Sequence, residues 1–267
     1  MAHVVSLVAA AWLTLSLMGA AQERTPEERG LAIATEADAR ASGWHDSTAE
    51  MEMTLVARTG DETVRRLHGS SLEVDGDGDR SLVVFDSPRD ISGTAVLTYA
   101  HPDEADDQWL YLPALKRVKR IAAANQSSAF MGSEFAYEDL VGDELGKYTY
   151  RWLRDEPCPG QAATLDCFVI ERRPRADTSG YSRQEVWLDS REYRPWKIDY
   201  FDRRDAVLKT LTYSAYERHL DRFWRAHDMV MVNHQTGRET RLHWAEIAFG
   251  TGLSDADFST AALRRAR

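Results

Sequence analysis

The chain alternates between apolar and polar side chains with a period of two residues over most of its length. Met51, Met53 and Leu55, for example, are separated by single polar residues. Comparable segments lie near residues 64–74, 80–86, 94–100, 107–112, 116–121, 147–152, 167–173, 183–189, 196–200, 207–217, 227–235 and 243–249. Since successive side chains of a strand point to opposite faces, each strand has one apolar and one polar face. About a dozen such strands predict a mainly β fold, an antiparallel barrel or curved sheet whose apolar side encloses a space.

Three segments break this pattern: residues 25–43, 122–145 and 253–267. The first opens with Thr25 and Glu28, which form a capping box, and has Pro26 at the first helical position, so it predicts a helix. In the last segment, Ser254 is a suitable N-cap for a short helix. The sequence contains no internal repeat, low-complexity tract or linker. Residues 22–267 are therefore expected to form a single domain.

The N-terminal segment predicts export. Residues 4–21 are almost uninterrupted apolar sequence ending in Gly19, Ala20 and Ala21, small residues that suit a signal peptidase. We expect residues 1–21 to be a cleavable signal peptide. The alternative is an uncleaved anchor, because the apolar run just reaches the length that spans a bilayer. Since no cysteine lies near the cleavage site, the chain is not expected to be a lipoprotein itself.

The two cysteines of the chain are consistent with export. Cys158 and Cys167 flank the turn-rich segment "PGQAATLD", and strand-like sequence lies on both sides. In an oxidising compartment this spacing favours a disulfide across the base of a hairpin. Two reduced thiols in the core are the alternative.

The chain lacks the sequence motifs of common enzyme active sites. HExxH, GxSxG, the phosphate-binding GxxxxGK[ST] and GxGxxG are all absent. The pairs Glu138–Asp139 and Asp143–Glu144 lie in polar sequence and are expected to be solvated. A formal net charge of −10 argues against a nucleic-acid partner, which favours a basic domain. We therefore expect no catalytic residues and no cofactor, although an exported hydrolase is opposed only by this absence of motifs.

No metal site is expected either. Three histidines fall within two adjacent predicted strands: His227, His234 and His243. Scattered histidines on strands are more often surface or core residues than ligands. Asp75, Asp77 and Asp79 resemble the first half of a calcium loop, but Arg80 stands where that loop needs glycine. A hairpin turn between two strands explains the three aspartates better.

Five segments together resemble a known family. They are "MEMTLVARTGDETVRRL", "SLVVFDSPRDISGTAVLTY", "DDQWLYLPALKRVKRIAAANQSSAFMGSEFAYEDL", "YTYRWLRDE" and "YSRQEVWLDSREYRPWKIDYFDRRDAVLKTL". They resemble the LolA-like outer membrane lipoprotein-sorting protein family, which belongs with the periplasmic lipoprotein carriers and receptors. The resemblance extends over roughly residues 45–250 and is most specific in residues 107–140. The residues with which the classical carrier contacts its cargo have no matched positions in this chain.

The resemblance implies a half-open, strongly curved antiparallel β-barrel with helices at its mouth and a cavity that accepts acyl chains. It further implies a monomeric periplasmic carrier that shields a lipoprotein or lipid on its way to the outer membrane. An inner-membrane transporter would then be the donor and an outer-membrane protein the acceptor. The alternative function is an accessory subunit that stays docked on a lipid-exporting membrane transporter and releases no cargo.

If the apolar faces of the strands point inward, the residues on them are candidates for the lining of such a cavity. Those for the wall are Met53, Leu55, Val83, Phe85, Trp109, Tyr111, Tyr150, Val186 and Ile198. Phe130, Phe135 and Tyr137, in the segment that follows the basic residues, are candidates for a lid, because aromatic residues and methionine adapt to varied apolar ligands. The face of each strand is uncertain by one residue, since a bulge moves every later side chain to the other face.

The strand at 116–121 carries four basic residues: Lys116, Arg117, Lys119 and Arg120. Basic side chains on both faces of a strand are difficult to bury, so this strand is expected at a sheet edge or near the cavity mouth. There it would meet anionic headgroups or an acidic partner surface. The alternative is a solvated run of charges followed by a loop that caps the core.

Overall fold

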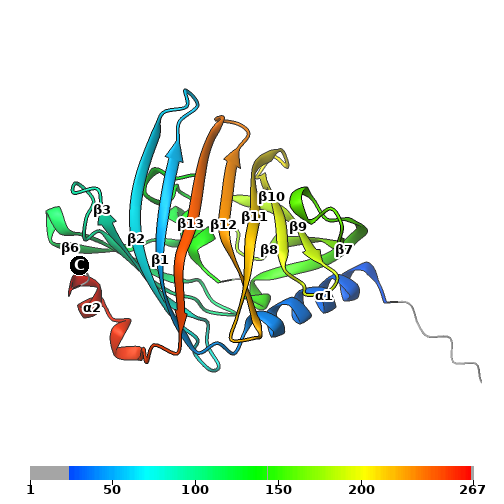
Figure 1. Cartoon of the computed structure of the whole chain (residues 1–267), viewed down its shortest axis with the longest axis horizontal. Helices are drawn as coiled ribbons and strands as arrows, with labels where there is room; N and C mark the ends of the chain where they lie inside the picture. Colours follow the sequence, from blue (N-terminus) through cyan, green and yellow to red (C-terminus); the bar gives the residue numbers. More distant parts are fainter. Residues whose placement is uncertain (1–23, 143, 266–267) are drawn as a thin grey trace, which may run out of the picture.

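A single antiparallel sheet of thirteen strands forms the body of the protein (Figure 1). The structure is a computed structural model and describes residues 24–142 and 144–265, so the predicted signal peptide lies outside the described residues. The strands are β1 (Asp46–Val56), β2 (Glu62–Leu72), β3 (Arg80–Ser87), β4 (Ala95–Tyr99), β5 (Asp107–Leu112), β6 (Arg117–Ile121), β7 (Tyr148–Pro157), β8 (Asp166–Pro174), β9 (Tyr181–Asp189), β10 (Pro195–Asp202), β11 (Val207–His219), β12 (Phe223–Asn233) and β13 (Arg238–Phe249). The predicted mainly β fold is confirmed.

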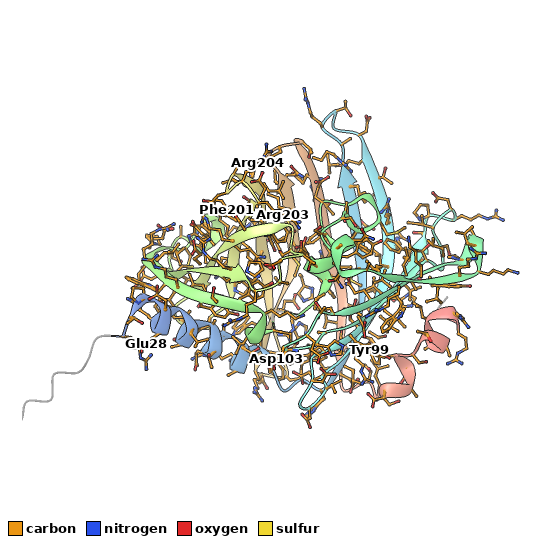
Figure 2. The ribbon with its side chains drawn as sticks, turned by 180° about the vertical axis from the view of Figure 1, so that it is seen from behind. Glu28, Tyr99, Asp103, Phe201, Arg203 and Arg204 are labelled. Carbon is orange, nitrogen blue, oxygen red and sulfur yellow. A yellow bond between two sulfur atoms is a disulfide. The ribbon has the colours of Figure 1, made fainter. Side chains whose placement is uncertain are left out.

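The first and last strands of the chain, β1 and β13, lie side by side in the middle of the sheet. The order is β6-β5-β4-β3-β2-β1-β13-β12-β11-β10-β9-β8-β7, so β1 pairs with β13, and β6 and β7 are the two open edges. The chain must therefore pass from one edge of the sheet to the other between β6 and β7. Residues 122–147 make this connection, and we call them the crossover segment. Figure 2, viewed from behind, shows this green segment passing over the sheet.

The crossover segment covers one face of the sheet, which we call the inner face. Met53 and Ile198 of the strands pack there in one buried cluster with Phe130 and Phe135 of the crossover segment. The opposite, outer face carries a second cluster, in which strand residues pack against Phe258 and Leu263 of the C-terminal tail. Both faces of the strands near β4 are thus buried, although by different parts of the chain.

Within residues 24–142 and 144–265, two α-helices flank the sheet, α1 (Pro26–Ala41) and α2 (Thr260–Arg265). The predicted capping box of α1 is present, because the Thr25 hydroxyl accepts from the Glu28 N–H and the Glu28 carboxylate accepts from the Thr25 N–H. Helix α1 packs closely on β7: a Cβ at Gly30 would lie 2.6 Å from the backbone of Arg151. Helix α2 lies on the outer face beside β4 and β5. In the described part of the chain, no helix has the length and apolar character to cross a membrane.

Short 3₁₀-helices occupy the connections. They are η1 (Pro113–Leu115), η2 (Ala123–Asn125), η3 (Phe130–Gly132), η4 (Tyr137–Leu140), η5 (Leu145–Lys147), η6 (Gly160–Ala162) and η7 (Asp255–Asp257). Four of them, η2 to η5, lie in the crossover segment, so its backbone turns repeatedly as it crosses the inner face. The aspartates of "DGDGD" lie in the connection between the antiparallel strands β2 and β3, as the predicted hairpin turn requires.

The predicted disulfide is confirmed. Cys158 and Cys167 are bonded at the end of the β7–β8 hairpin and are buried with Val169 and Trp187. Replacing both cysteines with alanine is expected to lower the free energy of unfolding by about 2–3 kcal/mol, because the unfolded chain gains the freedom of an open loop. Urea unfolding of the two forms measures the difference. Thiol titration of the denatured, unreduced wild type should find no free thiol, and two reactive thiols would contradict the pairing.

Candidate functional site

An apolar cavity of about 340 Å³ lies between the inner face of the sheet and the crossover segment. Strands β1, β2, β3 and β7 to β13 all contribute to its wall, and the crossover segment supplies Phe130, Phe135 and residues 138–142. The apolar side chains from the strands are Met51, Met53, Leu67, Val83, Tyr148, Tyr181, Ile198, Tyr200, Leu211, Tyr213, Met229, Leu242 and Trp244. A volume above about 300 Å³ with a predominantly apolar lining is typical of small-molecule sites.

A larger and more polar space of about 820 Å³, which we call the vestibule, adjoins this cavity. It lies between the C-terminal end of α1, the β2–β3 connection and η5, and it shares Gly142 and Arg172 with the apolar cavity. Its acidic residues are Asp38, Asp46, Glu73, Asp75, Asp77, Asp79 and Glu144, against the guanidinium groups of Arg172 and Arg225. The two spaces together suit an amphipathic ligand, with an apolar part in the cavity and a polar part in the vestibule.

The vestibule holds a carboxyl group with an unusual protonation equilibrium. Burial raises the pKa of Asp79 from 3.8 to about 7, and the neighbouring carboxylates of Glu144 and Glu73 add to this effect. Burial likewise raises the pKa of Glu144. In contrast, a hydrogen bond from His101 holds the pKa of Asp77 below its usual value. The vestibule therefore changes its charge near neutral pH.

Asp79→Asn is expected to stabilise the protein at about pH 8 and to have little effect at about pH 4. The folded-state pKa of Asp79 lies above the unfolded value, so wild-type stability falls as pH rises from about 4 to about 7. The gain should be about 1–3 kcal/mol, less than the roughly 4 kcal/mol that three pKa units represent, because the half-buried carboxyl is partly screened. Urea unfolding across this pH range measures it.

Asp77→Asn provides the control with the opposite sign. Because the pKa of Asp77 is lowered in the folded state, its ionised form stabilises the protein above the unfolded pKa. This variant should therefore lose stability at neutral pH. If the free energy of unfolding depends on pH in the same way for wild type and Asp79→Asn, the raised pKa of Asp79 is contradicted.

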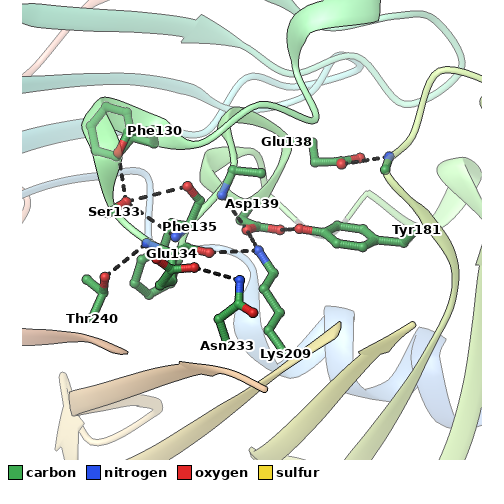
Figure 3. Close-up of polar contacts among 12 residues, drawn as sticks. Phe130, Ser133, Glu134, Phe135, Glu138, Asp139, Tyr181, Lys209, Asn233 and Thr240 are labelled. Carbon is green, nitrogen blue, oxygen red and sulfur yellow. Dashed lines mark hydrogen bonds and ion pairs between the residues drawn. The ribbon is translucent and has the colours of Figure 1, made fainter. Parts of the chain in front are cut away.

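A buried polar network fastens the crossover segment to the inner face (Figure 3). The Lys209 ammonium of β11 lies 2.6 Å from the Asp139 carboxylate, and both side chains are only 4% exposed. The Tyr181 hydroxyl donates to the other oxygen of Asp139 at 2.8 Å, and Lys209 also donates to the Glu134 carbonyl. Burial raises the pKa of Tyr181 well above its usual value, so its hydroxyl remains a donor.

Two further acidic residues of the crossover segment are held by distant parts of the chain, Glu138 by the β8–β9 connection and Glu134 by strands β12 and β13. Glu138 accepts hydrogen bonds from the Ser179 hydroxyl and the Gly180 N–H, and burial raises its pKa. Glu134 accepts from the Asn233 amide, and its N–H donates to the Thr240 hydroxyl (Figure 3). The prediction that Glu138 and Asp139 are solvated is therefore wrong, because the crossover segment brings Glu138 against the β8–β9 connection and Asp139 against strands β9 and β11.

Most of the predicted wall and lid residues lie on the inner face. Met53, Val83, Ile198, Phe130 and Phe135 line the apolar cavity. Two more of the predicted wall residues line the vestibule: Tyr150 and Val186. Three others pack in the surrounding inner-face cluster and are absent from the lining of both spaces: Leu55, Phe85 and Tyr137.

The assignment of Trp109 and Tyr111 to the cavity is wrong. Both side chains pack in the outer-face cluster with Phe258 of the tail. Strand β5 is apolar on both faces, because the inner face meets the core through Leu110 while the tail covers the outer face. In Figure 2, Tyr99 of β4 lies near this tail, and its hydroxyl donates to the Phe258 carbonyl.

The basic residues lie where the sequence predicts them, on the edge strand β6 and the turn before it. Lys116, Arg117, Lys119 and Arg120 are all exposed. Arg120 forms an ion pair with Asp107 of β5. The neighbouring Leu115, at the tip of the β5–β6 connection, is 62% exposed. This edge thus presents an apolar side chain near four exposed basic ones, of which Arg120 is paired with Asp107.

Several residues of the site escaped the sequence-based prediction. Met51, Leu211 and Leu242 line the cavity and occupy the apolar positions of alternating strands, so the period-two pattern could have found them. Met229 also lines the cavity, but it lies in the continuous apolar run 229–232, where alternation does not distinguish the two faces. Lys209 is different, because a lysine in a strand gives no sign that it is buried. Its partner Asp139 lies 70 positions earlier in the chain.

Comparisons with known proteins agree with this architecture. The chain is similar to a proposed outer membrane lipoprotein-sorting protein domain from Vibrio parahaemolyticus, with 52% identity and a TM-score of 0.86 over 90% of this chain and 100% of that one. It is also similar to a DUF1329 family protein from Desulfovibrio piger, with 31% identity and a TM-score of 0.83 over 90% and 100% of the two chains.

A third solved structure, a LolA superfamily protein from Nitrosomonas europaea, shares the fold at 19% identity and a TM-score of 0.70, over 87% of this chain and 98% of that one. The family model that matches residues 77–265 carries the description "Uncharacterized protein". A search of curated protein sequences found no match.

Proposed function

The chain belongs to the LolA-like outer membrane lipoprotein-sorting protein family, and we propose that it is a periplasmic carrier for acyl chains. In this proposal, residues 1–21 direct export and residues 22–267 act as one carrier domain. The cargo is a lipoprotein or lipid whose acyl chains occupy the apolar cavity while it travels toward the outer membrane. The proposal assigns no catalytic step to the protein.

The observation that carries this proposal is the apolar cavity beneath the crossover segment. The side chains of ten strands converge on it, yet they leave a space of about 340 Å³ instead of a filled core. Protein interiors are normally close-packed, so a space of this size lined by apolar groups favours an apolar ligand. Each methylene group buried there contributes about 0.8 kcal/mol.

The exposed basic edge supports a role at a charged surface. The exposed residues Lys116, Arg117 and Lys119 follow the exposed Leu115 in the chain at one open edge of the sheet. We assign to this edge the contact with anionic headgroups or with an acidic partner surface during loading or delivery. Such contacts weaken as salt screens them.

Extraction of the protein purified from the periplasm, followed by lipid mass spectrometry, tests the proposal. We expect acyl lipid in roughly equal amount to the protein, and transfer of that lipid to acceptor vesicles. Lipid that stays bound in the presence of acceptor membranes would instead favour a docked accessory subunit. If the protein carries no co-purified lipid and does not bind a fluorescent acyl probe saturably, the carrier function and the docked-subunit function are both contradicted.

A further inference from the structure

A cluster of two histidines and a glutamate, which lines neither the cavity nor the vestibule, lies on the hairpin of β11 and β12. It consists of Glu217, His219 and His227, whose potential ligand atoms all lie within 4.8 Å of one another. The Nε2 atoms of His219 and His227 are 3.4 Å apart, and the Glu217 carboxylate is 3.5 Å from Nε2 of His227. Two atoms that each lie about 2.0–2.2 Å from a tetrahedral zinc ion are about 3.3–3.6 Å apart. The two pairs that include His227 already have this spacing, and the third pair lies within 4.8 Å.

The hydrogen bonding of His227 prepares one nitrogen for a metal. Its Nδ1 lies 2.6 Å from the carbonyl oxygen of Trp244. A carbonyl can only accept, so Nδ1 carries the proton, and Nε2 of the neutral ring keeps its lone pair. Metal-binding histidines in proteins are commonly oriented in this way, with the outer ring nitrogen donating to a carbonyl or carboxylate.

The backbone places the three side chains together without the help of an ion. Glu217 and His219 are alternate residues of β11 and therefore share a face. The turn that follows contains Leu220 and Asp221, both with positive φ, and returns the chain so that His219 pairs with Phe223. The rings of His219 and His227 then stack at 5.6 Å with an interplanar angle of 19°.

The cluster is buried on the side of His227 and open to solvent on the side of Glu217. His227 is 9% exposed and held by its hydrogen bond, whereas the side chain of Glu217 is 68% exposed. Arg225 is the positive group opposite Glu217 in the ladder, but its guanidinium donates to the carbonyls of Trp224 and Ala41. The arrangement thus offers two imidazole nitrogens and one carboxylate oxygen, with room for a water molecule or another ligand at a fourth position.

We propose that Glu217, His219 and His227 bind one divalent transition-metal ion of the Zn²⁺ type. Imidazole and carboxylate ligands suit this class of ion. The site departs from the sequence-based expectation of no metal, which grouped His227 with His234 and His243. Those two histidines bond instead to Thr210 and Asp228, respectively.

The metal would join the two strands that hold the C-terminal end of α1. Arg222 and Arg225 of this hairpin donate to the carbonyls of Ser42 and Ala41, the last residues of the helix and its cap. Arg225 also lines the vestibule. An ion bound to the cluster therefore stiffens the hairpin that fixes α1 beside the vestibule.

Calorimetric titration of chelator-treated mature protein with Zn²⁺ tests the site. We expect one ion per chain, a Zn²⁺-dependent rise of the melting temperature, and a tetrahedral absorption spectrum with Co²⁺. His219→Ala and His227→Ala should each weaken binding by more than the roughly 10–100-fold that loss of a supporting hydrogen bond causes. Glu217→Gln should weaken it less.

His243→Ala is the matched control, because His243 is an exposed strand histidine close to the cluster but paired with Asp228. It should bind Zn²⁺ like the wild type. Melting curves recorded without metal verify that each variant is folded. Absence of wild-type binding, or equal binding by the wild type and the His219 and His227 variants, would overturn the proposal.

Discussion

Lys209→Met is expected to lower the free energy of unfolding by about 3–5 kcal/mol, because it leaves a buried carboxylate without its cation. Lys209 and Asp139 are each 4% exposed and lie 2.6 Å apart. Lys209 also donates to the Glu134 carbonyl, so the substitution removes two contacts between β11 and the crossover segment. Urea unfolding followed by tryptophan fluorescence measures the loss.

Two further variants isolate the cause. The double variant Lys209→Met with Asp139→Leu should be more stable than Lys209→Met alone, since it removes the unpaired carboxylate. The recovery should be partial, because the Tyr181 hydroxyl and the Ala136 N–H lose their acceptor. Lys197→Met, which breaks the more exposed pair with Asp199, should cost at most about 1 kcal/mol. A loss below about 1 kcal/mol for Lys209→Met alone would show that the ion pair does not hold the crossover segment.

Met229→Trp is expected to weaken the binding of a fluorescent acyl probe by about 50-fold. Met229 lines the apolar cavity, and a larger ring there takes space from the ligand. If it displaces about three methylene groups at about 0.8 kcal/mol each, the loss is about 2.4 kcal/mol, at 1.4 kcal/mol for each tenfold. Probe titration followed by fluorescence measures the dissociation constant.

Val230→Trp is the matched control for this prediction. Val230 is the next residue of β12 and is also half-buried, but it points to the opposite face of the sheet. The Val230→Trp variant should bind the probe with the same affinity as the wild type. Thermal melts of both variants separate a filled cavity from an unfolded protein. Equal probe affinities for Met229→Trp and Val230→Trp would place the probe outside the cavity.

Local sequence patterns were sufficient to predict a mainly β fold with an N-terminal helix. The alternation around Met53 predicted β1, and the capping box of Thr25 and Glu28 predicted the start of α1, because both signals arise between neighbours in the chain. The resemblance of five segments to the LolA-like family then predicted the curved, open architecture. The edge position of β6 followed from its basic residues, since charges on both faces exclude a buried strand.

The failures have a shared physical cause. Strand β5 is apolar on both faces, so alternation alone does not distinguish the side of Trp109 from that of Leu110. The tail that buries Trp109 lies far away in the sequence. Lys209 and Asp139 are likewise polar residues whose burial depends on the crossover of the chain from one sheet edge to the other. Contacts between distant segments leave no local pattern.

The central claim is that acyl chains occupy the space between the inner face and the crossover segment. An acyl chain with a photoactivated group near its methyl end, irradiated with the purified protein and mapped by peptide mass spectrometry, tests this directly. If acyl chains occupy this space, labels should fall on peptides that contain Met53, Phe135 and Met229, and unlabelled fatty acid should suppress the labelling. Labels confined to the outer face, around Trp109 and Tyr111, or labelling that no competitor suppresses, would contradict it.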